Sequence, residues 1–152
     1  MSLAALLRPL GALWVLVAFV AMIAAITAAA VGEPHLAPFF AMTAGMALVP
    51  GGLVLAATNG FKTGASALDA LGLAFLAWVT TPAVAALPFW LTGYFDPLDS
   101  LFEAYSAVTT TGATLLPEGD LPRSLIFWRA LLAWLGGYAT LLLAIGVFAA
   151  LD

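Results

Sequence analysis

The sequence has no cysteine and little charge. The absence of cysteine excludes disulfides, thiolate metal sites and cysteine nucleophiles. Only 8% of the 152 residues are charged, with 4 basic residues against 8 acidic ones. The chain lacks a basic cluster of the kind that nucleic acid or anionic lipid headgroups require, so we expect no nucleic-acid partner.

Histidine is almost absent as well. His35 is the only one, and it stands in a short polar turn beside Glu33, which is typical of an exposed residue. An intramembrane enzyme would need a nucleophile and a base at one depth, and it would have to use this histidine. We therefore expect no enzymatic activity and no catalytic residue.

Apolar residues, in contrast, make up 64% of the chain, which is typical of helical membrane proteins and not of soluble domains. Four uncharged stretches, 10–31, 36–57, 70–95 and 130–151, are long enough to cross a bilayer and predict transmembrane helices. The last of these helices is expected to begin before its uncharged part, at residues 121–124. A cleaved signal peptide is the competing interpretation of the first stretch, because Arg8 precedes it and Ala28 to Ala30 resemble a cleavage site. Its apolar core is, however, longer than the ~7–15 residues expected of a signal peptide.

A polar linker over 58–66 divides the chain into a leading two-helix membrane hairpin, 1–65, and a second unit, 66–152. The second unit contains a further uncharged run, 104–117, of only 14 residues. As a helix this run would reach roughly 21 Å, less than the ~30 Å of a bilayer core. The sequence therefore predicts an all-α integral membrane protein with four transmembrane helices and one re-entrant pore helix and filter loop between helices three and four.

The ends of this short helix are marked by residue type. Ser100 and Glu103 match a capping box, which places the start of the helix near Ser100. Three β-branched residues, Thr109 to Thr111, favour extended backbone after it, and Gly112 can take backbone angles that other residues avoid. Two interpretations of the following segment stay open: a helix end and tight turn near the surface, or a line of carbonyls that replaces an ion's hydration shell.

Charged and small residues near this segment suggest how it is held. Five acids flank it and predict a negative mouth that concentrates cations: Asp96, Asp99, Glu103, Glu118 and Asp120. Arg129 near the start of the last helix could extend to the interface or pair with Glu103, Glu118 or Asp120. Gly136 and Gly137 give the last helix a small-residue face suited to close packing or to a hinge.

Four segments, in order and at consistent spacing, resemble the first pore repeat of the Trk/Ktr/HKT superfamily of potassium transporters, specifically the TrkH-type membrane subunit. They are LFEA at 101–104, SAVTTTGAT at 106–114, LPRS at 121–124 with FWR at 127–129, and WLGG at 134–137. In that family two leading helices precede four repeats, so the resemblance covers the whole chain. Tyr138 departs from the pattern, since the family often has a smaller residue there, and this weakens the case for a hinge.

The resemblance implies a selectivity filter whose backbone carbonyls coordinate potassium, at Thr110, Thr111, Gly112, Ala113 and Thr114. It implies no organic cofactor, a place in the cell inner membrane or plasma membrane, and a cytoplasmic ring of nucleotide-binding regulatory subunits as a partner. One loop supplies a quarter of such a filter. The hypothesis is therefore potassium transport by a homo-oligomer, most simply a homotetramer, or together with a chain that carries the other pore repeats. The alternative is a non-conducting assembly or structural membrane protein, or a truncated remnant of a four-repeat transporter.

Overall fold

The computed structural model describes residues 3–61, 67–115, 119 and 121–149, and these contain helices and turns but no strand. The helices are α1 (Leu3–Ala30), α2 (Ala37–Ala57), α3 (Ala67–Ala85), α4 (Leu87–Leu91), α5 (Pro97–Val108) and α6 (Arg123–Ala149). The predicted all-α class is confirmed. The predicted boundary between residues 65 and 66 lies outside the described residues.

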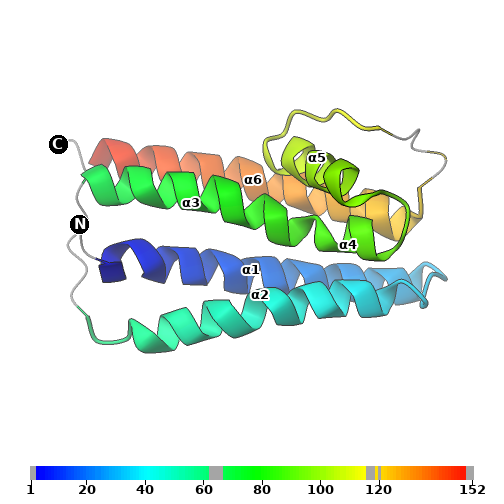
Figure 1. Ribbon diagram of the computed structural model, residues 1–152, viewed down its shortest axis with the longest axis horizontal. Coiled ribbons are helices and arrows are strands. Elements are labelled where there is room, and N and C mark those ends of the chain that lie inside the picture. Colours follow the sequence, from blue (N-terminus) through cyan, green and yellow to red (C-terminus); the bar gives the residue numbers. More distant parts are fainter. Residues whose placement is uncertain (1–2, 62–66, 116–118, 120, 150–152) are drawn as a thin grey trace.

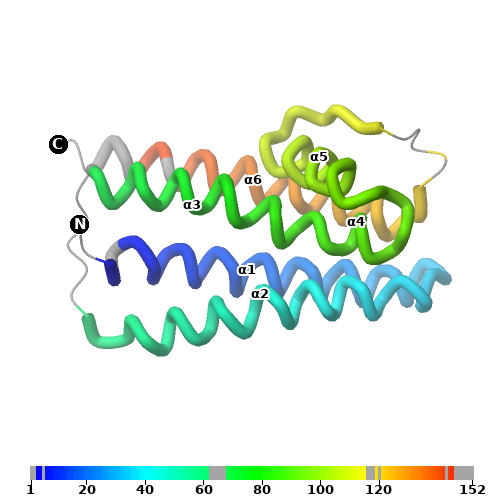
Figure 2. The backbone as a smooth tube through the Cα atoms, in the orientation of Figure 1, coloured from blue at the N-terminus to red at the C-terminus, as the bar shows by residue number. Residues whose placement is uncertain are grey.

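Four long helices run along the length of the molecule (Figure 1). α1 and α2 form an antiparallel pair, and α3 and α6 lie on the other side of α1, with which both are in contact. α5 packs on α6 and α3 over one half of the bundle only. The tube in Figure 2 shows that the chain after α5 turns back toward the end at which α6 begins.

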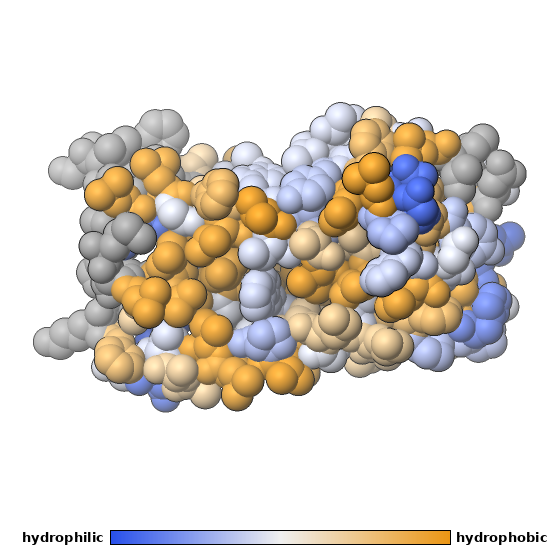
Figure 3. All heavy atoms as spheres, in the orientation of Figure 1, coloured by the Kyte–Doolittle hydropathy of each residue, from blue (hydrophilic) through white to orange (hydrophobic). Residues whose placement is uncertain are grey.

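Four segments are long and apolar enough to cross a membrane: Leu6–Ala30, Ala37–Ala57, Leu68–Leu91 and Arg123–Leu142. They agree with the four predicted spans in number and order, although not in every boundary, and they identify a multi-pass membrane protein. Exposed large apolar side chains spread over these helices, and Figure 3 shows them as orange across one face of the molecule. Such a surface suits contact with lipid, because hydrocarbon chains take the place of water around it.

The third span is interrupted and is shorter than predicted. α3 ends at Ala85 and α4 begins at Leu87, where Pro88 occupies the first turn and needs no hydrogen-bond partner for a backbone N–H. The helix then ends at Leu91 instead of continuing to residue 95, because Gly93 adopts a positive φ of 78° and turns the chain. Phe95 folds back onto Phe89, with ring centroids 5.8 Å apart.

α1 and α2 cross closely at two glycines. A Cβ atom on Gly51 would lie 2.9 Å from the carbonyl oxygen of Gly11, and one on Gly11 would lie 3.0 Å from the carbonyl oxygen of Gly51. The neighbouring Gly52 faces open space, with nothing within 4 Å. The helix continues through Pro50, and the close packing at Gly51 accounts for a glycine at this place in α2.

The core joins the leading hairpin to the second unit. Phe40 of α2 and Trp128 of α6 are both fully buried and meet edge to face with centroids 6.0 Å apart. The Trp128 indole N–H donates to the carbonyl of Ala85 at 3.0 Å, at the interruption between α3 and α4. This bond satisfies a carbonyl at the place where the helix is broken.

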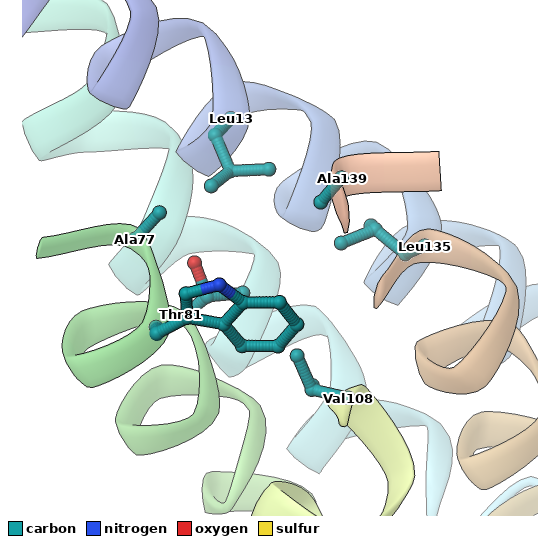
Figure 4. Close-up of a pocket in the computed structure, with 7 residues that line it drawn as sticks. Leu13, Ala77, Thr81, Val108, Leu135 and Ala139 are labelled. Carbon is teal, nitrogen blue, oxygen red and sulfur yellow. The ribbon is translucent and has the colours of Figure 1, made fainter. Parts of the chain in front are cut away.

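α1, α3, α5 and α6 meet around a cavity of about 10 Å³ (Figure 4). Its lining is almost entirely apolar and includes Leu13, Val108 and Leu135. The hydroxyl of Thr81, which also lines it, has no hydrogen-bond partner among the described residues. Because Val108 is the last residue of α5 and is 2% exposed, the end of this short helix is embedded in the bundle.

Candidate ion-binding loop

The start of α5 is set by Asp96, not by the predicted capping box. The Asp96 side chain accepts a hydrogen bond from the N–H of Asp99 at 2.8 Å, so the helix begins at Pro97, three residues earlier than predicted. Ser100 lies inside the helix and donates to the carbonyl of Asp96 at 2.7 Å. Glu103 is thereby free for a different task.

The chain makes a tight turn directly after α5, and the N–H groups of this turn donate to the last carbonyls of the helix. The N–H groups of Thr111 and Gly112 both donate to the carbonyl of Ser106, at 2.9 and 3.3 Å. Thr110 has a φ of 58° and Gly112 a φ of 77°. The positive φ was expected at Gly112 but not at Thr110, where it strains the backbone because threonine is β-branched. The helix therefore ends before the threonine run, as predicted, but Thr109 and Thr110 form a turn instead of extended backbone.

Residues 109–115, called here the polar loop, are all exposed on the described chain. Five of them are the predicted filter residues Thr110, Thr111, Gly112, Ala113 and Thr114. Beside them lies an open hollow of about 300 Å³, lined by Ser106, Ala107, Thr110, Gly112, Ile126, Arg129, Ala130 and Ala133. The hollow lies between the polar loop and α6, which is long and apolar enough to cross a membrane.

Glu103 holds the far end of the polar loop from inside the protein. Its side chain has no exposed surface. One carboxylate oxygen, Oε1, accepts hydrogen bonds from the hydroxyl of Thr114 at 2.8 Å and from the N–H of Leu115 at 2.7 Å. Bonds to an ionised group are stronger than neutral ones, so this carboxylate fixes both residues relative to α5.

Arg129 of α6 completes the support. Its Nε atom lies 3.0 Å from Oε2 of Glu103, and its side chain is only 12% exposed. Nε of Arg129 and Oε2 of Glu103 are not aligned for a hydrogen bond, and neither has a hydrogen-bond partner among the described residues, so their contact is an ion pair. A second nitrogen, Nη2, donates to the carbonyl of Ala113 at 3.2 Å. The predicted pairing of Arg129 with Glu103 is confirmed; the other two predicted partners, Glu118 and Asp120, lie outside the described residues.

The carbonyl of Ala113 accepts hydrogen bonds from two different helices. Besides Arg129, the hydroxyl of Ser106 donates to it at 2.6 Å. A carbonyl oxygen has two lone pairs, and here both are used by protein donors. Ala113 is therefore tied to α5 and α6 at once.

The expectation of five acids around the mouth needs a correction. Glu103 is buried and neutralised by Arg129, so it does not add negative charge to the surface. Asp96 is exposed and Asp99 is half-buried, and both lie at the start of α5. The sequence pattern overstated the charge because a carboxylate inside a helix and one in a loop look alike until the fold is known.

The two glycines predicted as a small-residue face differ in their surroundings. A Cβ atom on Gly136 would overlap the carbonyl oxygen of Val108 and would lie 2.7 Å from its carbonyl carbon. At Gly137 a Cβ atom would meet nothing within 4 Å. Close packing, one of the two predicted roles, applies to Gly136; nothing tests a hinge at either position.

The start of α6 is held by a residue that the sequence did not point to. Glu33, in the turn between α1 and α2, accepts hydrogen bonds from the N–H groups of Arg123 and Ser124 at 2.9 and 3.0 Å, and from the Ser124 hydroxyl at 2.6 Å. Partial burial raises the pKa of Glu33, but these hydrogen bonds and the Arg123 charge lower it by more, so the net shift is downward. A carboxylate 90 residues away in sequence thus caps this helix.

The fold and the site first define a class: a multi-pass helical membrane protein in which a short helix ends in a polar loop held by a buried ion pair. No protein-family model matches the chain. Its relatives include an uncharacterized cation transporter of Methanocaldococcus jannaschii, 42% identical over 76 residues. They also include the Trk system potassium uptake proteins TrkH of Halomonas elongata, 38% identical over 82 residues, and TrkG of Escherichia coli, 34% identical over 73 residues.

These matches cover 49%, 52% and 46% of this chain, but only 16%, 17% and 15% of the respective relatives. The chain thus spans about one sixth of the length of the curated relatives it matches. The predicted resemblance to a TrkH-type membrane subunit of a potassium transporter is confirmed over about half of the chain.

Proposed function

We propose that this chain takes part in potassium transport across the membrane by contributing the polar loop, as the end of a re-entrant pore helix, to an ion pathway. The observation that carries the proposal is the support of the loop. Glu103, Arg129 and Ser106 hold residues 113–115 from inside the protein, while residues 110–114 face outward beside an open hollow. A segment held in this way presents backbone oxygens at fixed positions, which is what replacing an ion's hydration shell requires.

Two further points support a cation, and potassium in particular. The relatives named as Trk proteins are potassium uptake proteins, and a further relative is named as a cation transporter. The C-terminal, negative end of the α5 dipole also lies at the polar loop. Within the predicted filter we assign Ala113, whose carbonyl is already bonded twice, to holding the loop, and Thr110, Thr111, Gly112 and Thr114 to the ion.

One polar loop does not surround an ion, so the pathway needs more copies of it. The proposed complex is a homotetramer, or this chain with another that carries further pore repeats, in the cell inner membrane or plasma membrane. A cytoplasmic nucleotide-binding regulatory subunit remains a proposed partner on the strength of the resemblance alone. Membrane lipid would contact the exposed apolar side chains of the long helices.

The test is Gly112→Asp, measured as potassium flux into vesicles that contain the assembled complex. Gly112 has a positive φ and nothing within 4 Å of a Cβ atom, so the substitution adds a side chain and a charge to the loop. We expect flux to be lost while membrane insertion stays intact. Gly60→Asp is the matched control, because Gly60 also has a positive φ and open space but lies at the end of α2.

Unchanged flux in Gly112→Asp would contradict the proposal. Equal loss in both variants would show that the strain of a positive φ, and not the loop, is responsible. No flux in the unaltered complex would favour the non-conducting alternative.

A further inference from the structure

The backbone at the end of α5 meets the backbone of α6 at Gly136. The carbonyls of Tyr105, Ser106 and Ala107 accept hydrogen bonds from the first residues of the polar loop, at 2.9 to 3.3 Å. The next carbonyl, that of Val108, faces α6 at Gly136. Both residues are buried, so this contact lies inside the protein beneath the polar loop.

This contact tolerates no side chain on α6. A Cβ atom at residue 136 would overlap the Val108 oxygen and would lie 2.7 and 3.0 Å from the Val108 carbonyl carbon and Cα. These are backbone atoms of a helix end, and they cannot rotate aside as a side chain can. Any larger residue must therefore push the end of α5 away from α6, by roughly 1.5 Å if normal contact distances are to be restored.

The polar loop must follow such a movement. Residues 109–112 are hydrogen-bonded to the last turn of α5, so they move with it. Ala113 is bonded both to Ser106 of α5 and to Arg129 of α6. Arg129 and Gly136 are seven residues apart, which is two helical turns, and so they lie on the same face of α6. The ion pair at Arg129 and the backbone contact at Gly136 therefore hold α5 against the same face of α6.

We infer that Gly136 is a positioning residue for the polar loop: its missing side chain sets how closely the end of α5 approaches α6, and so where the loop begins. The inference rests on the proposed function for its effect on ion selection, but the contact itself is independent of transport. Gly137 has no part in it, because its Cβ position is open.

The experiment compares Gly136→Ala with Gly137→Ala in the full chain in lipid bilayers. The two substitutions add the same methyl group at adjacent helical positions, so the general effect of alanine in a helix cancels. The first measurement is solid-state NMR of the backbone of residues 108–113. We expect shifted resonances in Gly136→Ala and unshifted ones in Gly137→Ala. Equal spectra for both variants would overturn the inference.

The second measurement is the ratio of potassium to sodium flux in the same preparations. We expect Gly136→Ala to lower this ratio by on the order of a hundredfold, the scale of rate loss that a misplacement of about 1 Å causes in enzyme active sites. We expect Gly137→Ala to leave it unchanged. A purely structural role would lower the amount of folded protein without changing the ratio, and that result would also overturn the inference.

Should Gly136→Ala fail to fold, the unaltered chain supplies the test. A cross-peak between the carbonyl carbon of Val108 and the Cα of Gly136 is expected, and its absence would overturn the inference. If the resonances shift in Gly136→Ala but neither variant nor the unaltered chain conducts, the positioning contact stands and the proposed function fails.

Discussion

Glu103 and Arg129 carry opposite charges inside a protein whose surroundings are apolar. Removing two such groups from water is costly, and the cost is offset only when pairing and hydrogen bonds are nearly complete. Here both oxygens of Glu103 are used, one by the polar loop and one by Arg129, and Arg129 also donates to Ala113. The pair is therefore best explained as a device that fixes the loop.

Glu103→Gln should lower the apparent free energy of unfolding by about 3 kcal/mol, because it leaves the charge of Arg129 buried without a partner. The measurement is reversible unfolding of the purified chain in mixed detergent. Asp99→Asn is the control, since Asp99 is only half-buried and its side chain is outside this cluster. The double variant Glu103→Gln, Arg129→Gln should lose less than the sum of the two single variants. Additive losses would show that the two residues do not act as a pair.

At the scale of elements, the leading hairpin does more than precede the second unit. Its turn supplies Glu33, whose carboxylate binds the free N–H groups at the start of α6. The same α6 carries Arg129 and Gly136, which hold the polar loop and the end of α5. The hairpin therefore positions the helix against which the candidate site is built.

The Glu33 cap should make stability depend on pH. The pKa of Glu33 is lowered in the folded chain from its ordinary value of 4.5, so its contribution is present above that pH and is lost as pH falls through the folded value. We expect Glu33→Gln to cost about 1 kcal/mol at pH 7, as loss of a partly screened helix cap does. The difference from the unaltered chain should be full above pH 4.5 and should shrink as pH falls through the lowered pKa of the folded chain.

Parallel unfolding measurements at pH 7 and at a series of lower pH values give this difference directly. Ser124→Ala, which removes one donor but keeps the charge of Glu33, should lose less than Glu33→Gln at pH 7. A gap between the unaltered chain and Glu33→Gln that does not change with pH would contradict the role of the ionised carboxylate.

At the scale of the whole molecule, the polar loop is open on one side. The hollow beside it is lined by Thr110, Gly112 and Arg129 and is not closed by any other described part of the chain. Polar backbone at membrane depth is tolerated only when protein or a water-filled cavity covers it. The proposed function therefore requires further copies of such a loop around one axis.

The mass of the complex in lipid nanodiscs, measured by native mass spectrometry, tests the composition. We expect four copies of this chain, since four loops of equal geometry enclose an ion without any other component. A single copy alone would contradict the homotetramer and would leave a second chain with the other pore repeats as the proposed partner. A single copy with an additional protein of larger mass would identify that partner.

Features that depend on residues close together in the sequence were predicted well. Four spans, the end of α5 before the threonine run and the positive φ of Gly112 follow from short windows of residue type. The start of α5 was misplaced because Ser100 and Glu103 fit a capping box equally well, and only the fold shows that Asp96 takes that role. The strain at Thr110 has no sequence signal, since it results from the bonds of Thr111 and Gly112 to Ser106.

The sequence by itself determined the class of this protein, the order of its helices and its resemblance to potassium transporters, because hydropathy and turn chemistry act over neighbouring residues. Only the tertiary structure decided that Glu103 pairs with Arg129, that Glu33 caps α6 and that Gly136, not Gly137, receives the end of α5. These contacts join residues 26 to 91 positions apart or depend on which side of a helix meets a neighbour. The docking of helices in three dimensions, and not the local pattern, selects among the partners that the sequence allows.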